Sequence, residues 1–140
     1  MPEKSKTEYN QLEAGDDLPA SSYKLDGPMV AIYLKAVEET GGLYQETELV
    51  PPMAIAAYAM AALSESVYLP PGTIHISQEL GFVGTASVND TITSFAKVSR
   101  KQSRGEFHFL TIEFNVFNQN QAAVLVGKTS FILPEQSDGQ

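Results

Sequence analysis

The chain has 140 residues, of which 43% are apolar and 19% are charged, and it contains no cysteine. This length supports one domain with a substantial core, and the absence of cysteine excludes disulfides, thiolate nucleophiles and Cys-based zinc sites. A formal net charge of −8 argues against sequence-independent binding to nucleic acid or to an anionic membrane, because both need clustered Lys and Arg.

Residues 1–17 are predicted to form a disordered tail, because they are rich in Lys, Glu, Gln, Asp and Gly and show no apolar periodicity. They also lack the apolar centre of a signal peptide, and no apolar run approaches the roughly 18–20 residues of a membrane span. We therefore expect a cytoplasmic protein with one domain over residues 18–134 and a second tail over residues 135–140. A short strand is predicted near residues 18–25.

A first helix is predicted to begin at residues 26–28, where Asp26 can cap the first turn and Pro28 fits it. Apolar residues follow at helical spacing: Met29, Val30, Ile32, Tyr33, Ala36 and Val37. The glycine pair at positions 41–42 predicts the end of this helix, since left-handed caps usually require glycine.

A second helix is predicted over residues 52–64, after Pro51. Residues 53–63 carry no charge and include several alanines, which favours a helix over a strand. The run is too short to cross a membrane. A helix that is apolar on all its faces has to be covered on all of them, so we expect the rest of the chain to surround it.

The remaining chain is predicted to supply that cover as antiparallel strands, because the connecting loops are too short for crossovers. Residues 73–82 alternate, with Ile74, Ile76, Leu80 and Phe82 on one face and His75, Ser77 and Glu79 on the other. Residues 91–101 place Ile92, Ala96 and Val98 together, and residues 107–117 place Leu110, Ile112, Phe114 and Val116 together. Residues 103–105 and 118–121 are predicted turns, the second because Asn tolerates positive φ. Residues 122–133 are apolar on both faces, as in a central strand.

The simplest way to bury the helix with these strands is an α+β hotdog fold, in which a curved antiparallel sheet wraps around a central apolar α-helix. The stretch Pro70-Pro71-Gly72-Thr73-Ile74-His75-Ile76-Ser77-Gln78-Glu79-Leu80-Gly81-Phe82, followed by Val88-Asn89-Asp90-Thr91-Ile92, resembles the MaoC-like acyl dehydratase and (R)-specific enoyl-CoA hydratase family. The second piece is similar to the family's Val-x-Gly-Asp-Thr-Leu, with Asn89 in place of Gly. Asn118-Gln119 resembles the Asn-Gln that often closes a family hairpin. The resemblance covers residues 18–134, and its motifs specify fold better than chemistry.

The resemblance implies two hotdogs that pair edge to edge, either as a homodimer or as a heterodimer with another hotdog protein. An acyl thioester of CoA or of acyl-carrier protein would bind at their interface. It also implies an Asp and a His, five positions apart, that hydrate a trans-2-enoyl thioester, and it implies no cofactor. The stretch 39–44 matches this pattern with Glu39 for the Asp and Tyr44 for the His. Tyrosine, with an ordinary pKa of about 10 against about 6.5 for histidine, is a poor base and can still donate a hydrogen bond.

In the family, an N–H at the start of the central helix polarises the thioester carbonyl. Here Pro51 and Pro52 open that helix and lack an N–H, so Met53 is the remaining candidate donor. The overhanging segment that covers the active site in active relatives is shortened in this chain. Glu39 and Tyr44 are therefore either a modified dyad or a solvated helix-end residue and a packed tyrosine.

The chain has two histidines, neither at metal-ligand spacing from the other, and we expect no metal site. His108 falls on the apolar face of its strand, and is either near a ligand or a core histidine with a satisfied hydrogen bond. His75 is expected to be exposed or at an interface. Glu65, at the end of the central helix, is either a thioesterase acid or a solvated residue. Three functions follow: an altered hydratase or dehydratase, a non-catalytic acyl-thioester-binding subunit that partners another hotdog, and a thioesterase.

Overall fold

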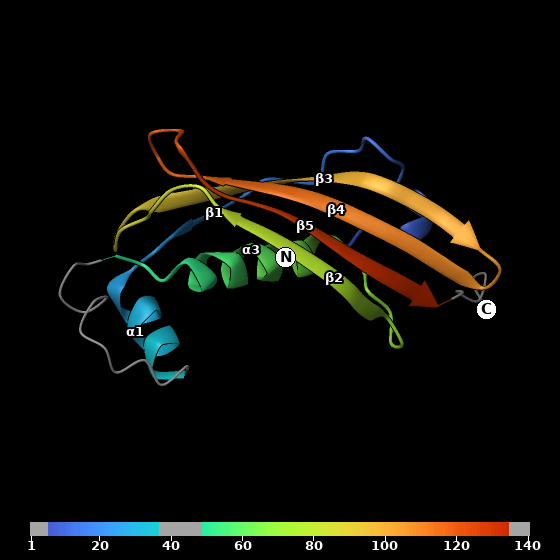
Figure 1. Ribbon diagram of the computed structural model, residues 1–140, viewed down its shortest axis with the longest axis horizontal. Coiled ribbons are helices and arrows are strands. Elements are labelled where there is room, and N and C mark those ends of the chain that lie inside the picture. Colours follow the sequence, from blue (N-terminus) through green and yellow to red (C-terminus); the bar gives the residue numbers. More distant parts are fainter. Residues whose placement is uncertain (1–5, 37–48, 135–140) are drawn as a thin grey trace, which may run out of the picture.

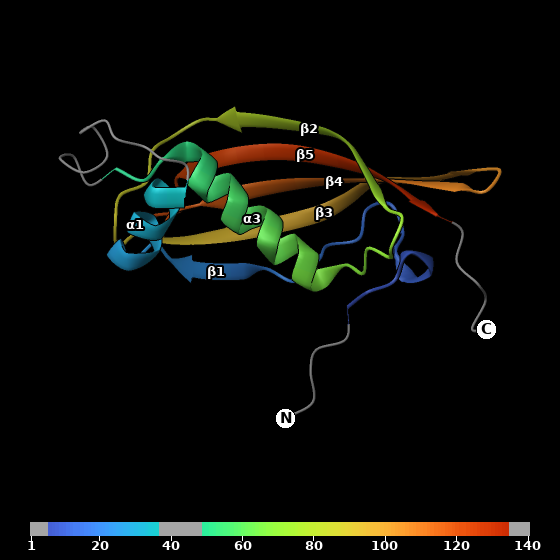
Figure 2. The same ribbon diagram turned by 90° about the horizontal axis from the view of Figure 1, so that it is seen from below.

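The computed structural model describes residues 6–36 and 49–134. Its strands form one curved antiparallel sheet in the order β1-β3-β4-β5-β2, and the helix α3 lies across the concave face (Figures 1 and 2). The strands are β1 (Ser21–Lys24), β2 (Ile74–Phe82), β3 (Thr91–Arg104), β4 (Phe107–Phe117) and β5 (Ala123–Pro134), and the helices are η1 (Tyr9–Gln11), α1 (Gly27–Ala36) and α3 (Pro52–Ser66). This arrangement is the α+β hotdog fold that the sequence predicts.

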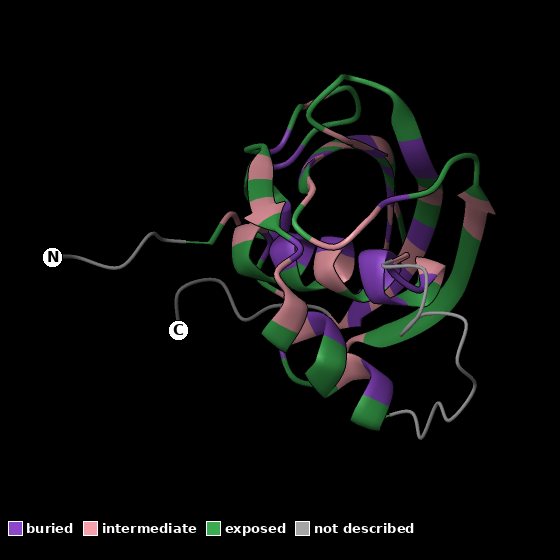
Figure 3. Cartoon of the chain, turned by 90° about the vertical axis from the view of Figure 1, so that its left-hand side faces the viewer, coloured by how far each residue is buried: buried purple, intermediate pink, exposed green. Residues whose placement is uncertain are grey.

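The core lies between α3 and the concave face of the sheet. The first half of α3 packs with α1 and with the start of β5, and the second half packs with η1 and with the far ends of β4 and β5. Figure 3 shows buried residues on the helix and on the inner side of the strands. The predicted inward faces of β3 and β4 are confirmed, because Ile92, Val98, Leu110, Ile112 and Val116 are all fully buried.

The expectation that α3 is covered on all sides is wrong for the described part of the chain. Met53, Ala57, Ala61 and Ser64 form an exposed stripe along the helix, and Met53 is 51% exposed. Seen from below, most of α3 has no further described layer over it (Figure 2). A single sheet can cover only one side of a helix, so the absence of charge from residues 52–63 does not guarantee that they are fully buried.

The expected tail over residues 1–17 differs from the structure over residues 6–17, which pack against the domain. Tyr9 and Leu12 are buried in the second half of the core, and the Lys101 ammonium donates to the Leu12 carbonyl at 2.7 Å. Bridges join Thr7 to Val67 and Asp17 to Lys97. Two apolar side chains without periodicity were enough to anchor a polar segment.

The motif that resembles Val-x-Gly-Asp-Thr-Leu builds a turn. Asn89 has a φ of 77°, a conformation that suits glycine and, among other residues, asparagine, which explains the exchange of Gly for Asn. Asp90 accepts from the Ser87 backbone N–H at 2.8 Å and from the Gln119 side chain at 3.0 Å. The matching residues therefore hold the 87–90 turn against the β4–β5 hairpin, and act in structure rather than in chemistry. In that hairpin the positive φ falls on Gln121 (62°) instead of an asparagine.

Strand β2 forms one edge of the sheet, and its predicted pattern of faces is wrong at one end. The register against β5 shifts between His75 and Ser77, so this β-bulge reverses the faces before it. His75 lies opposite the buried Phe131, and Leu80 packs on the inner core. His75 therefore shares the inner face with Leu80 and not the outer face with Ser77 and Glu79. A bulge adds one unpaired residue, and simple alternation in a sequence does not reveal it.

Candidate functional site

The start of α3 is the candidate site that the sequence singles out. Pro51 is its N-cap and provides no side-chain cap, and Pro52 is the first helical residue. The Ala54 N–H donates to the Pro51 carbonyl at 2.9 Å. Met53 thus carries the first N–H of the helix, at a position where no preceding turn supplies an acceptor, and its side chain is exposed.

Two contacts fix the position of this helix start. The Val50 N–H donates to the Ala86 carbonyl at 2.8 Å, and a bridge joins Leu49 to Ser87. The chain therefore enters α3 tied to the segment that leaves the edge strand β2. The helix dipole and the first N–H of the helix, for which no acceptor is found among the described residues, make this end suitable for a carbonyl oxygen that gains negative charge.

Glu39 and Tyr44, the predicted dyad, lie outside the described residues, as does the predicted glycine end of the first helix. The structure describes α1 up to Ala36 and the chain again from Leu49. The Asp26 side chain caps α1 as predicted, by accepting from the Met29 N–H at 2.8 Å.

His108, predicted as a possible ligand contact, lies at the far end of β4 from the helix start. Its Nδ1 is 2.8 Å from the Ser103 hydroxyl, and its ring lies 4.8 Å from that of Tyr9. The Tyr9 hydroxyl also contacts Ser103, at 3.3 Å. His108 is half-buried and hydrogen-bonded, which favours the structural alternative and separates it from Met53.

His75 is exposed, as predicted, and contacts the inner face through two residues of β5. Its ring stacks on Phe131 at 4.9 Å between centroids, and its Nε2 is 2.6 Å from the Thr129 hydroxyl. Thr129 is a fully buried polar residue whose hydroxyl also donates to the Ser77 carbonyl at 3.5 Å, so His75 is the nearer of the two partners that satisfy this hydroxyl.

Glu65 is exposed in the last turn of α3. Twelve residues separate it from Met53, which is about 18 Å along a helix. It cannot act on a carbonyl bound at the helix start, so the two positions belong to separate hypotheses.

Tyr23 of β1 and Tyr58 of α3 form a contact that the sequence did not predict. The Tyr23 hydroxyl donates to the Tyr58 carbonyl at 3.0 Å. Burial raises the pKa of Tyr58, and the charge of Asp26 and the neighbouring Tyr33 raise it further. Burial also raises the pKa of Tyr23, as does the charge of Glu65, while a hydrogen bond with Ser21 lowers it. These residues come from three separate elements, so no sequence motif could have indicated their contact.

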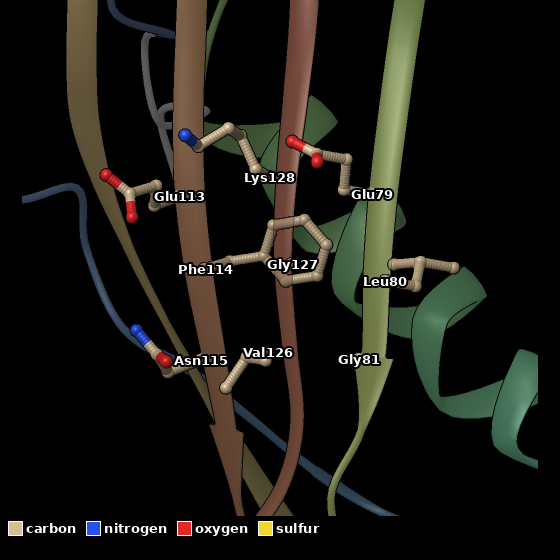
Figure 4. A pocket seen from close by; sticks show the side chains of 9 residues that line it. All are labelled: Glu79, Leu80, Gly81, Glu113, Phe114, Asn115, Val126, Gly127 and Lys128. Carbon is tan, nitrogen blue, oxygen red and sulfur yellow. The ribbon is translucent and has the colours of Figure 1, made fainter.

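The convex face carries a shallow hollow of about 390 Å³ over β2, β4 and β5 (Figure 4). Its charged residues are Glu79, Glu113 and Lys128. Gly81 leaves it open on the β2 side, because a Cβ there would lie 3.0 Å from Val126. The hollow mixes both signs of charge and lies on the face of the sheet opposite α3.

No group of three or more His, Cys, Asp or Glu residues within residues 6–36 and 49–134 is placed to hold a metal ion. Among the helices in these ranges, none has both the length and the apolar character that a membrane span requires.

Comparison with known proteins shows the fold. No family model matches the chain, and no curated protein matches it in sequence. Among solved structures, the R-hydratase PhaJ1 from Pseudomonas aeruginosa superposes with a TM-score of 0.77 at 20% identity, over 91% of this chain and 86% of that one. An (R)-hydratase from A. caviae gives a TM-score of 0.74 at 21% identity, over 88% and 98%. A chain of the ChsH1-ChsH2 complex from Mycobacterium tuberculosis gives 0.71 at 11% identity, over 86% and 98%. The resemblance to MaoC-like proteins is thus confirmed at the level of the hotdog fold.

Proposed function

We propose that this protein binds acyl thioesters at the start of α3 and that its hydratase site is altered. The observation that carries the proposal is the exposed position of Met53, which has the first N–H of α3 and lies in a helical stretch (residues 52–63) without charge, in a fold shared with two (R)-hydratases. The carrier of the thioester is either CoA or a carrier protein, and the Met53 N–H would polarise the thioester carbonyl.

The proposed reaction adds water across the Cα=Cβ bond of an enoyl thioester. Glu39 would take a proton from the water as the water oxygen bonds to Cβ, and the protonated Glu39 would then give that proton to Cα, so that OH and H add across the double bond and the carboxylate is regenerated. Glu39 is one methylene longer than the family's Asp. Tyr44 would hold the water by donating a hydrogen bond, because its high pKa keeps it protonated at neutral pH.

The proposed hydration is tested with crotonyl-CoA and longer enoyl-CoAs as substrates, and the loss of enoyl absorbance measures the turnover. We expect slow turnover that Glu39→Gln abolishes and Tyr44→Phe reduces. Turnover unchanged by Glu39→Gln would remove that residue from the mechanism, and absence of turnover at any chain length would leave binding without catalysis.

Acyl-CoA binding, measured by calorimetry, tests the site independently of turnover. Met53→Glu places a carboxylate beside the first N–H of the helix, where it interacts favourably with the helix dipole and repels an incoming oxyanion. We expect it to abolish binding without loss of stability. Ala57→Glu, one turn further along the same exposed stripe, is the matched control and should bind like wild type. Equal binding by Met53→Glu and Ala57→Glu would refute the assignment of the site.

A second candidate function is a non-catalytic subunit that pairs with a hotdog chain. The specific observation is the edge position of β2, which pairs only with β5 among the described strands and is mostly exposed (Figure 3), together with the exposed stripe of α3. An unprotected edge strand invites pairing with another strand. We infer a dimer through β2, either with a second copy or with a different hotdog protein.

Light scattering after size exclusion tests the edge. Gln78→Lys puts a charge on β2, which should weaken pairing, whereas Thr85→Lys puts the same charge on the exposed segment after the strand. We expect wild type and Thr85→Lys to be dimers and Gln78→Lys to be monomeric. A wild-type monomer that dimerises only with a second hotdog chain would favour the heteromeric form.

A further inference from the structure

The outer face of the sheet carries a row of charges that balance one another. Lys97, Glu113, Lys128 and Glu79 stand directly opposite one another across β3, β4, β5 and β2. Each charge therefore has an opposite charge on the neighbouring strand, an arrangement that stabilises cross-strand pairs. The hollow of Figure 4 lies on this row and inherits its mixed charge.

The next row toward the β3–β4 turn has no such balance. Arg100 faces Thr111, which faces Ser130, which faces Ser77. Arg104 faces Phe107. Both arginines are exposed, and neither has a carboxylate opposite it. The protein has only nine Lys and Arg against seventeen Asp and Glu, and the only two arginines among them both lie in this part of β3.

Both arginines line one hollow of about 280 Å³, which we call the arginine hollow. No carboxylate is among its lining residues within the described chain: Ile76, Ser77, Arg100, Gln102, Arg104, Phe109, Thr111, Ser130 and Phe131. Gln102 accepts a hydrogen bond from one nitrogen of Arg100 and so restrains that guanidinium, which makes no second hydrogen bond with any residue in the described ranges. The β-bulges at positions 75–77 in β2 and 98–100 in β3 lie on either side.

Hydroxyl groups form the floor of the arginine hollow. The Thr111 and Ser130 hydroxyl oxygens are 2.9 Å apart, so one donates to the other and the second hydroxyl keeps its proton for another acceptor. Phe109 and Ile76 add an apolar side. A surface that combines guanidinium and hydroxyl donors with an apolar wall suits an oxyanion that is attached to an apolar group.

We propose that the arginine hollow binds the phosphate of a phosphate monoester, with the organic part against Phe109 and Ile76. Arg100 and Arg104 pair with the dianion, and a hydroxyl from Thr111 or Ser130 donates to it. The site lies on the convex face, whereas the proposed thioester site lies at the start of α3 on the concave side. The two proposals therefore stand or fall separately.

Titration of the ¹⁵N-labelled full chain with phenyl phosphate and with inorganic phosphate, at constant ionic strength, tests the proposal. We expect saturable amide shifts in β3, β4 and β5 around the arginine hollow, and tighter binding of phenyl phosphate than of phosphate. Arg100→Gln and Arg104→Gln should each weaken binding about fivefold or more. Lys97→Gln removes the same charge one row away and should change the affinity less than about twofold.

Three outcomes would overturn the proposal. Shifts that grow linearly without saturation would show no site. An equal loss of affinity in Lys97→Gln and in the arginine variants would show a general charge effect. Equal affinity for phenyl phosphate and for inorganic phosphate would refute recognition of a phosphate monoester and would show only a site for an inorganic anion. Because all three substituted residues are exposed, retained amide dispersion in the variants keeps these comparisons valid.

Discussion

Replacement of Gly127 by alanine should destabilise the domain strongly, through a single methyl group. Gly127 of β5 lies opposite Phe114 of β4, and a Cβ at position 127 would lie 2.3 Å from the Phe114 Cζ. An ordinary carbon–carbon contact is about 3.5 Å, so the ring would have to move by about 1 Å. Phe114 is only 3% exposed and belongs to the core under α3, where it has little room to move. We expect Gly127→Ala to cost about 2–3 kcal/mol of unfolding free energy.

Urea and thermal unfolding measure this cost, with a melting temperature lower by roughly 6–12 °C. Gly81→Ala is the matched control, because its Cβ would lie 3.0 Å from an exposed Val126 side chain on the convex face. It should cost less than about 1 kcal/mol. Adding Phe114→Leu to Gly127→Ala should recover part of the loss, since the two sites share one volume. Equal stabilities for Gly127→Ala and Gly81→Ala would refute the placement of the Phe114 ring over Gly127.

Three further changes test the turns and the tyrosines. Asn89→Gly should leave urea stability unchanged or slightly raised, whereas Asn89→Val should cost about 1–2 kcal/mol, because a β-branched residue strains at positive φ. Asp90→Ala and Gln119→Ala should each cost about 1 kcal/mol, and a double-mutant cycle should show that the two losses do not add; additive losses would rule out the bond between them. The raised pKa values of Tyr23 and Tyr58 mean that the folded state holds these phenol protons more tightly than the unfolded chain does. The contribution of the two protonated phenols to the free energy of unfolding is therefore complete below about pH 10 and is lost as pH rises above it. Tyr58→Phe should flatten this alkaline decline in urea-melt stability, and an unchanged slope would contradict the shift.

The sequence predicted the fold because its signals are local. The uncharged, alanine-rich stretch 52–63 of α3, the Asp26 cap and the alternation in β4 each specify their element without reference to distant residues. The motif around Asn89 could be recognised because a turn with positive φ restricts the residue types that fit. The match between this sequence and the family motif indicates only the 87–90 turn. This is why the fold could be predicted from the motif while the activity could not.

The features that could not be predicted from the sequence depend on the register between neighbouring strands. The arginine hollow needs Arg100 of β3 opposite Thr111 of β4, and that alignment exists only because a bulge precedes Arg100. The bulge after His75 likewise moves that residue to the inner face. One inserted residue changes the face of everything beyond it, and no alternation pattern in a single strand records where the insertion occurs.

The distribution of polar residues along α3 indicates which end of the helix a partner would cover. Its first twelve residues, 52–63, contain no charged side chain, while its last three are Ser-Glu-Ser. Figure 2 shows the helix running obliquely from the β2 side of the sheet to the β1 side, and the bond from Val50 to Ala86 ties its start to the end of β2. A chain that pairs along β2 would therefore approach Met53 first and leave Glu65 in water. The exposed apolar stripe and the unpaired edge strand are then one surface rather than two, and the proposed thioester site lies at its border.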